Sequence, residues 1–186
     1  MRKDITSKLK EEHRLILRML DLLERNARHA ASGGAVDCRF FLAAVDFVRN
    51  FADRFHHAKE EDILFEALVD NGMPRENSPV AVMLIEHEQG RAFVRGMEEA
   101  ARRALDGIPG QEEAIAENAL GYVGLLRDHI KKEDEILYPL AERVMPDERR
   151  ERIEKGYAAA ESGKGGEETE KRYRNMVERY ELKTGD

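Results

Sequence analysis

One stretch of sequence occurs twice, once in each half of the chain, and it constrains the fold more than any other feature. The first copy, HHAKEEDILF, begins at His56, and the second, HIKKEDEILY, begins at His129. Each copy has a histidine, a glutamate four residues later, a further acid, and then Ile-Leu-aromatic. Residues four apart on an α-helix lie one above the other on the same face. Each copy therefore predicts a His–Glu pair on one face of a helix.

A shorter repeat precedes each copy at nearly the same interval. Glu12-His13 stands before the first copy as Glu86-His87 stands before the second. The chain thus has the pattern of a duplicated helix pair, in which one helix brings a lone histidine and the next brings His-x-x-x-Glu. Four histidines and two glutamates in this arrangement suggest a site for two metal ions between the helices of a bundle.

The sequence around these motifs is typical of four long helices. Apolar residues recur at the helical period, and turns that contain glycine or proline separate the periodic segments. We expect helices over 4–31, 37–70, 78–105 and 111–145. The short turns between them predict an all-α, up-down-up-down four-helix bundle. Pro139 should remove one backbone hydrogen bond from the last helix and kink it or end its regular part.

The chain becomes more polar after the fourth helix. Residues 147–160 and 167–182 each have the pattern of a helix, on either side of a glycine-rich break. We expect these helices to pack on the bundle or on a partner. The chain would then consist of a bundle, residues 1–145, and a helical C-terminal extension, residues 146–186.

Composition narrows the class of protein. Charged residues make up 37% of the 186 residues and aromatic residues 6%, with no Trp, which favours helices over sheets. The formal net charge of −7 argues against nucleic acid as the main partner. The single cysteine, Cys38, excludes an intrachain disulfide. The polar N-terminus and the lack of a long apolar run predict a cytoplasmic protein that does not enter a membrane.

The histidines and glutamates of the repeat stand in rows that are otherwise apolar. An unpaired carboxylate in such a row costs several kcal/mol or changes its pKa, and a cation would offset this. Imidazole with carboxylate suits iron, zinc, manganese or copper. The predicted metal ligands are His13, His56, Glu60, His87, His129 and Glu133. A structural His–Glu ion pair, or a core histidine bonded to a backbone group, is the alternative interpretation.

Two other histidines have weaker patterns. His57 shares its row with Asp53 and Glu61, which is a polar face, so we interpret it as a surface residue or a neighbour of the ligands. His29, near the end of the first helix, has the pattern of a surface or capping residue.

At these residues the sequence resembles the hemerythrin-like, HHE cation-binding family. The resemblance covers about residues 5–145 and rests on the doubled His-x-x-x-Glu with Ile-Leu-Phe and Ile-Leu-Tyr-Pro after it. It implies a four-helix bundle around a non-haem di-iron centre with an oxo or hydroxo bridge. By position, Glu60 and Glu133 would bridge the two irons, and the four histidines would be terminal ligands. Manganese or zinc would satisfy the same ligands.

The sequence departs from the oxygen-carrying hemerythrins, which have His-x-x-x-His on the third helix. Here Met83 and Arg91 flank His87. Those proteins also have His-x-x-x-x-Asp on the fourth helix, and Asp134 stands at that spacing, although the repeat favours Glu133. The pattern is closer to a subgroup that includes the iron- and oxygen-sensing domain of a ubiquitin-ligase subunit. Reversible oxygen carriage is therefore not the function that the resemblance implies.

The predicted ligands leave coordination positions open. Four terminal histidines and two bridging glutamates supply eight bonds, whereas two octahedral irons have about twelve. Open positions for water, O2, NO or peroxide mark a site that reacts or senses. Three functions stay open: a di-iron protein that binds or senses O2, NO or iron; a di-iron enzyme acting on peroxide or NO, with Tyr122 as a redox candidate; and a metal-dependent regulatory module with a protein partner or as a homodimer.

Overall fold

The computed structural model describes residues 4–163 and 165–183, and these form helices and turns without any strand, which confirms the all-α prediction. The α-helices are α1 (Ser7–Ala31), α2 (Cys38–Phe47), α3 (Glu66–Asp70), α4 (Pro79–Leu105), α5 (Glu112–Lys132), α6 (Tyr138–Val144), α7 (Asp147–Ser162) and α8 (Gly166–Lys183). Three π-helical segments join some of them: η1 (Val48–His57), η2 (Glu60–Phe65) and η3 (Glu133–Leu137).

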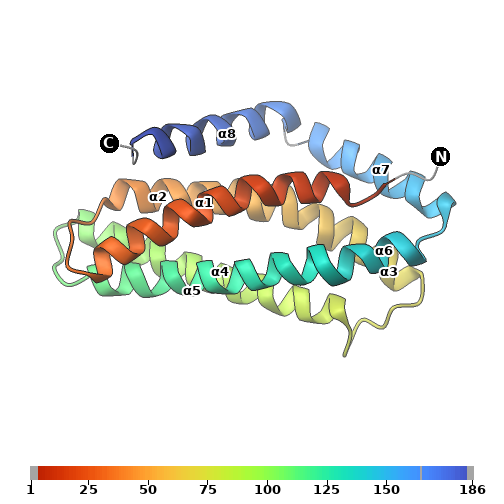
Figure 1. Ribbon diagram of the computed structural model, residues 1–186, viewed down its shortest axis with the longest axis horizontal. Helices are drawn as coiled ribbons and strands as arrows, with labels where there is room; N and C mark the ends of the chain where they lie inside the picture. The colour runs from red at the N-terminus through yellow and green to blue at the C-terminus, as the bar shows by residue number, and fades with distance from the viewer. Residues whose placement is uncertain (1–3, 164, 184–186) are drawn as a thin grey trace.

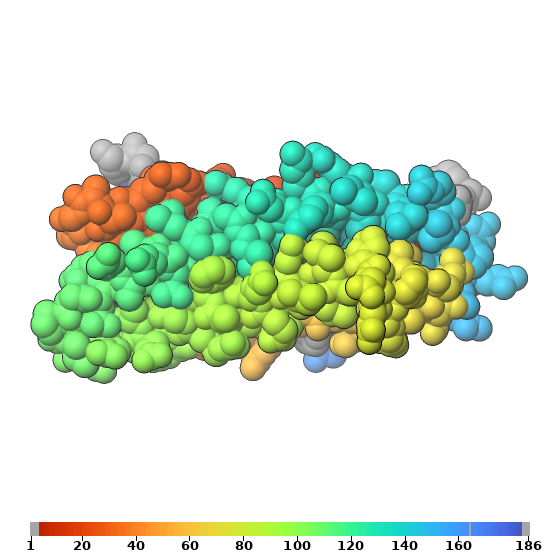
Figure 2. Space-filling view, turned by 90° about the horizontal axis from the view of Figure 1, so that it is seen from below, coloured from red at the N-terminus to blue at the C-terminus, as the bar shows by residue number. Residues whose placement is uncertain are grey.

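The helices form four long segments along the long axis of the molecule (Figure 1). The first is α1, the second runs from α2 through η1 and η2 to α3, the third is α4, and the fourth runs from α5 through η3 to α6. The chain turns back after each segment, so consecutive segments run in opposite directions (Figure 1). The face in Figure 2 shows α4 and α5 side by side.

Local signals explain where the long segments begin and end. The Asp37 carboxylate accepts hydrogen bonds from the backbone N–H groups of Arg39 and Phe40, at 3.0 and 3.1 Å, and so caps α2. Ser78 caps α4 in the same way, with Pro79 at the first helical position. Gly72 follows α3 with a φ of 99°, a conformation that glycine adopts at little cost. These caps agree with the predicted boundaries to within one or two residues.

The second and fourth segments are not regular α-helices where they carry the repeated motif. His56 lies in η1, Glu60 in η2 and Glu133 in η3. A π-helical turn has i→i+5 hydrogen bonds and is wider than an α-helical turn, and such turns are frequent at functional sites. Pro139 lies in the first turn of α6, directly after η3. The missing N–H of Pro139 therefore falls where the helix type changes, and the helix continues to Val144.

The core consists of two apolar clusters with a polar layer between them. On α1, Leu9 belongs to one cluster and Ile16 to the other, and His13 lies between them in sequence. On α4, His87 lies in the same way between the two clusters. The polar layer thus crosses the interior of the molecule between a larger and a smaller apolar cluster.

The C-terminal helices pack on the outside of the first two segments (Figure 1). The Tyr173 ring of α8 lies edge-on to Phe47, with ring centroids 5.5 Å apart. Gly156 of α7 faces Ile63 so closely that an added Cβ would lie 3.1 Å from its Cγ2. At the base of α7, the buried Arg150 donates a hydrogen bond of 3.0 Å to the carbonyl of Met145. The C-terminal helices thus contact the first two long segments within the described part of the chain.

Within the described parts of the chain, no helix has the length and apolar character needed to cross a bilayer.

Candidate metal centre

The six predicted ligands meet in the polar layer, and each is at most 2% exposed. They come from all four long segments, and their ligand atoms fall into two groups that share Glu60. Atoms within each group lie within 4.8 Å of one another. One group consists of His13, His56, Glu60 and Glu133, and the other of His57, Glu60, His87 and His129. The structure therefore brings together every residue that the repeat predicts as a ligand, and adds His57.

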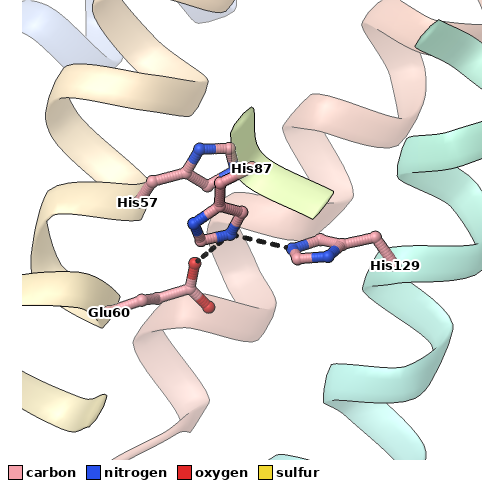
Figure 3. Close-up of side chains that lie close together, drawn as sticks. All are labelled: His57, Glu60, His87 and His129. Carbon is pink, nitrogen blue, oxygen red and sulfur yellow. Dashed lines mark hydrogen bonds and ion pairs between the residues drawn. The ribbon is translucent and has the colours of Figure 1, made fainter. Parts of the chain in front are cut away.

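Each glutamate reaches a histidine from both halves of the chain. The Glu133 carboxylate lies 3.3 Å from Nε2 of His13 and 3.2 Å from Nε2 of His129, through different oxygens. The Oε2 atom of Glu60 lies 3.6 Å from Nε2 of His56 and 3.6 Å from Nε2 of His87 (Figure 3). A carboxylate that lies between two imidazoles from different halves of the chain has the placement of a bridge between two metal ions.

The carboxylate oxygens also show that a cation fits here. Oε2 of Glu60 and both carboxylate oxygens of Glu133 are buried and have no hydrogen-bond partner among the described residues. Buried carboxylate atoms are costly unless they are paired or coordinate a metal. Nitrogen atoms of four histidines surround these oxygens, and nitrogen with carboxylate oxygen is the donor set of iron, manganese and zinc sites.

The two glutamates influence each other's pKa in the metal-free chain. Burial and the charge of Glu133 raise the pKa of Glu60 well above its usual range, which favours its neutral form. It accepts a hydrogen bond from the hydroxyl of Tyr138 through its other oxygen. Burial also acts to raise the pKa of Glu133, but His129 and His13 outweigh it and hold that pKa well below the usual range. The pKa values of the two glutamates are thus shifted in opposite directions.

Each of the four histidines has a carboxylate on its Nδ1 atom. The distances are 2.9 Å for His13–Asp134, 2.8 Å for His56–Glu12, 2.7 Å for His87–Glu61 and 2.9 Å for His129–Glu86. Such a contact fixes the ring and its tautomer and directs Nε2 toward a metal. Asp134 therefore lies beside His13 rather than among the bridging glutamates.

This outer set of carboxylates is not among the predicted site residues, although the sequence carries a signal for it. Glu12 and Glu86 directly precede the repeated lone histidines, and Glu61 and Asp134 directly follow the repeated glutamates. All four therefore recur at the same interval as the predicted ligands. Their distance to a histidine on another helix depends on how the segments pack, which the sequence does not show.

The structure places His57 beside Asp53 and Glu61, as its row predicts, and as a neighbour of the predicted ligands rather than at the surface. Its side chain is buried, with 5% of the residue exposed, and its ring stacks on His87 with centroids 3.8 Å apart and planes at 12° (Figure 3). The π-helical turn is the physical reason, because it turns successive residues through a smaller angle and so brings His56 and His57 both inward. In-plane lone pairs of two near-parallel rings do not converge, so His57 in this orientation does not join His87 on one ion. His29 is exposed, as predicted.

Metal binding to this centre should release protons. Burial alone would lower the pKa of His13, but Asp134 and Glu133 outweigh it and raise it to about 9. The stability that this proton contributes to the metal-free chain is complete below about pH 6.5 and is lost as the pH rises through 9. We expect at least about one proton released per chain on metal binding at pH 7.5, and an affinity that rises between pH 6.5 and 9. Calorimetry in two buffers of different ionisation enthalpy measures the release. Asp134→Asn should reduce it, and a release of zero would contradict the predicted site.

Histidines and carboxylates buried between helices are typical of helical proteins that bind metal ions. The chain matches the family model of the hemerythrin HHE cation binding domain over residues 4–141. It therefore belongs to the hemerythrin HHE cation-binding family, which confirms the resemblance drawn from the repeated motifs. No curated protein and no solved structure matches the chain. Cation binding is thus supported both by the family and by the buried histidine and glutamate groups.

Proposed function

We propose that the protein is a non-haem di-iron protein that binds or senses O2, NO or iron, within an up-down-up-down bundle formed by residues 1–145. The observation that supports this most is the position of the two buried glutamates, each within 3.6 Å of histidine nitrogens from both halves of the chain. Two ions held in this way would be close enough to share an oxygen bridge. The coordination positions that the protein leaves open would bind a small diatomic ligand or peroxide.

Iron is favoured by the donor set. The centre offers imidazole nitrogen and carboxylate oxygen and no thiolate, since Cys38 lies on α2 in the apolar part of the molecule. Such donors with open positions suit iron that reacts with oxygen species, although manganese and zinc accept the same ligands. When bound, the iron would supply redox chemistry and binding of the diatomic ligand. The protein would supply the fixed histidines and a dry surrounding.

Metal analysis of the aerobically purified full chain tests the proposal, together with absorbance between about 300 and 550 nm. We expect about two irons per chain and oxo-to-iron charge-transfer bands. Zinc alone, or no metal and no such bands after anaerobic iron loading, would refute the di-iron proposal. His29→Leu, which removes an exposed histidine, serves as a control that keeps full iron content.

A specific observation also supports an enzyme acting on peroxide or NO. The hydroxyl of Tyr138 donates a hydrogen bond to Glu60 and lies 3.3 Å from Nε2 of His13. A phenol at this place could donate a hydrogen bond or a proton to a bound oxygen ligand. Turnover of peroxide or NO by iron-loaded protein, lost in Tyr138→Phe while two irons remain bound, would favour the enzyme over the sensor.

A contact between the C-terminal extension and the residues around the centre supports a third proposal, a metal-dependent regulatory module. Lys59 is fully buried and contacts both Glu12, which holds His56, and Glu161 of α7. This chain of contacts links residues 146–186 to the centre. A change in oligomeric state on removal of the extension, with iron binding intact, would favour a module whose extension responds to the metal.

A further inference from the structure

The two halves of the chain are alike around the centre, so their differences stand out. Superposing the two copies of the repeat places His13 on His87, His56 on His129 and Glu60 on Glu133. The outer carboxylates match in the same way, as does Lys59 with Lys132. A centre built only from these residues would have two equivalent metal positions.

Two substitutions between the halves make the positions unlike. His57 corresponds to Ile130, and Phe65 corresponds to Tyr138. The position near His13 therefore has a phenol beside it, whereas the position near His87 has an additional imidazole. The ligand atoms of His57 and His129 belong to the same group within 4.8 Å.

A cavity of about 230 Å³ adjoins the His87 side of the centre. His57, Gly90, Val94, Tyr122 and Leu126 are among its lining residues, as is His87 itself. This volume far exceeds the roughly 30 Å³ that a water molecule occupies in the liquid.

The other half fills the corresponding place with apolar side chains. The residues that correspond to His57, Gly90 and Val94 are Ile130, Ile16 and Leu20, and all three are buried in the core. Gly90 lacks the β-branched side chain found at position 16, and a Cβ at Gly90 would lie 3.4 Å from the ring of Tyr122. On the His87 side, the residues beside the centre are thus smaller or more polar than their counterparts in the other half.

Two buried polar atoms of residues that line this cavity have no hydrogen-bond partner among the described residues. Nδ1 of His57 and the hydroxyl of Tyr122 make no hydrogen bond within the described chain, although Nδ1 lies 3.4 Å from a carboxylate oxygen of Asp53. Burial raises the pKa of Tyr122 far above its usual range, so its hydroxyl remains a donor. Unpaired buried donors cost about 1–3 kcal/mol each, and a polar ligand would satisfy them.

The outer end carries several arginines, of which Arg49 is paired with Glu98, and Arg91 with Asp53 and Glu61. Four arginines and two carboxylates line the cavity: Arg49, Arg54, Arg91, Arg95, Asp53 and Glu86. Arg54 and Arg95 are exposed, whereas His57 and Tyr122 are buried. Exposed cationic side chains at a rim raise the local concentration of anions and their rate of entry.

We propose that this cavity is the entry chamber through which a small monoanion, of the size of azide or nitrite, reaches the metal position between His87 and His129. The ring of His57 donates a hydrogen bond to the anion once it is bound. The inference rests on the proposed di-iron function and adds to it a single side of entry and a charge class of ligand.

The test uses the iron-loaded full chain with azide as the probe, after metal analysis of each variant. His57→Leu removes the hydrogen-bond donor, and Gly90→Ile restores the filling side chain found at position 16. We expect His57→Leu to weaken azide binding at least about tenfold and Gly90→Ile to slow association by a similar factor. Both variants should keep about two irons. The matched controls are His29→Leu and Gly124→Ile, two exposed helical positions at which the wild-type rate and affinity should be unchanged.

Substitution of the exposed rim gives an independent readout. Arg54→Gln with Arg95→Gln should slow azide association, weaken its dependence on salt, and leave the binding of neutral NO unchanged. The inference would be overturned if the cavity and rim variants bound azide as their controls do. Loss of iron in His57→Leu would also overturn it, because His57 would then be a ligand. If Gly90→Ile fails to fold, the rim variants and His57→Leu still test the inference. A wild-type chain that binds no iron would instead refute the proposed function.

Discussion

Replacing Glu133 by alanine should lower the iron content from about two ions per chain to one or none, and abolish the oxo-to-iron absorption. The reason is geometric, since one residue supplies the carboxylate oxygens that lie 3.3 and 3.2 Å from Nε2 of His13 and His129. Glu60 also has a carboxylate oxygen within 4.8 Å of a ring nitrogen of each of these histidines, but Glu133 makes the closer contacts. Glu60→Ala should have the same effect, because Glu60 belongs to both groups of ligand atoms.

The same variant should also lose the stability that metal provides. A ligand that binds only the folded chain raises its stability with the logarithm of the ratio of free ligand to Kd, by about 4 kcal/mol at a thousandfold excess over Kd. We therefore expect iron to raise the Tm of the wild-type chain and to leave that of Glu133→Ala almost unchanged. Glu135→Ala, an exposed neighbour on the same helical segment, is the control. Two irons and an unchanged spectrum in Glu133→Ala would show that the ligand assignment is wrong.

Replacing Lys59 by methionine should destabilise the chain by about 3–5 kcal/mol, since it leaves a buried carboxylate without its cation. Lys59 is 0% exposed and contacts Glu12 and, at 2.9 Å, Glu161 of α7. Burial raises the pKa of Glu12 to about 7 even with Lys59 present. A carboxyl with a raised pKa loses stability as the pH rises through that value. The loss in Lys59→Met should therefore be larger at pH 8 than at pH 5.

The duplicated chain supplies a matched control for this prediction. Lys132 stands at the position that corresponds to Lys59, and it contacts Glu86, which holds His129 in the same way. Lys132 is 37% exposed in its side chain, so Lys132→Met should cost about 1 kcal/mol or less. Urea unfolding of the metal-free variants measures both. Equal losses at positions 59 and 132 would contradict the role assigned to burial by α7.

Much of the fold and of the candidate centre followed from sequence periodicity. The duplicated motifs, with apolar residues at helical spacing around them, predicted an all-α chain and placed six polar side chains on inward faces. These predictions succeed because the period of a helix decides which residues share a face, whatever the helix packs against. The structure brings those six side chains together, and their role as metal ligands stays a prediction.

Other features depend on contacts between segments that are distant in sequence. The pairing of each histidine with a carboxylate, the packing of α7 over Lys59 and the cavity beside Gly90 all require the distances between helices. His57 shows the limit most clearly, because α-helical periodicity assigns it to a polar face and the π-helical turn moves it into the interior. Helical period and polarity thus predict a face, but the type of turn and the packing of neighbouring segments decide which side chains meet.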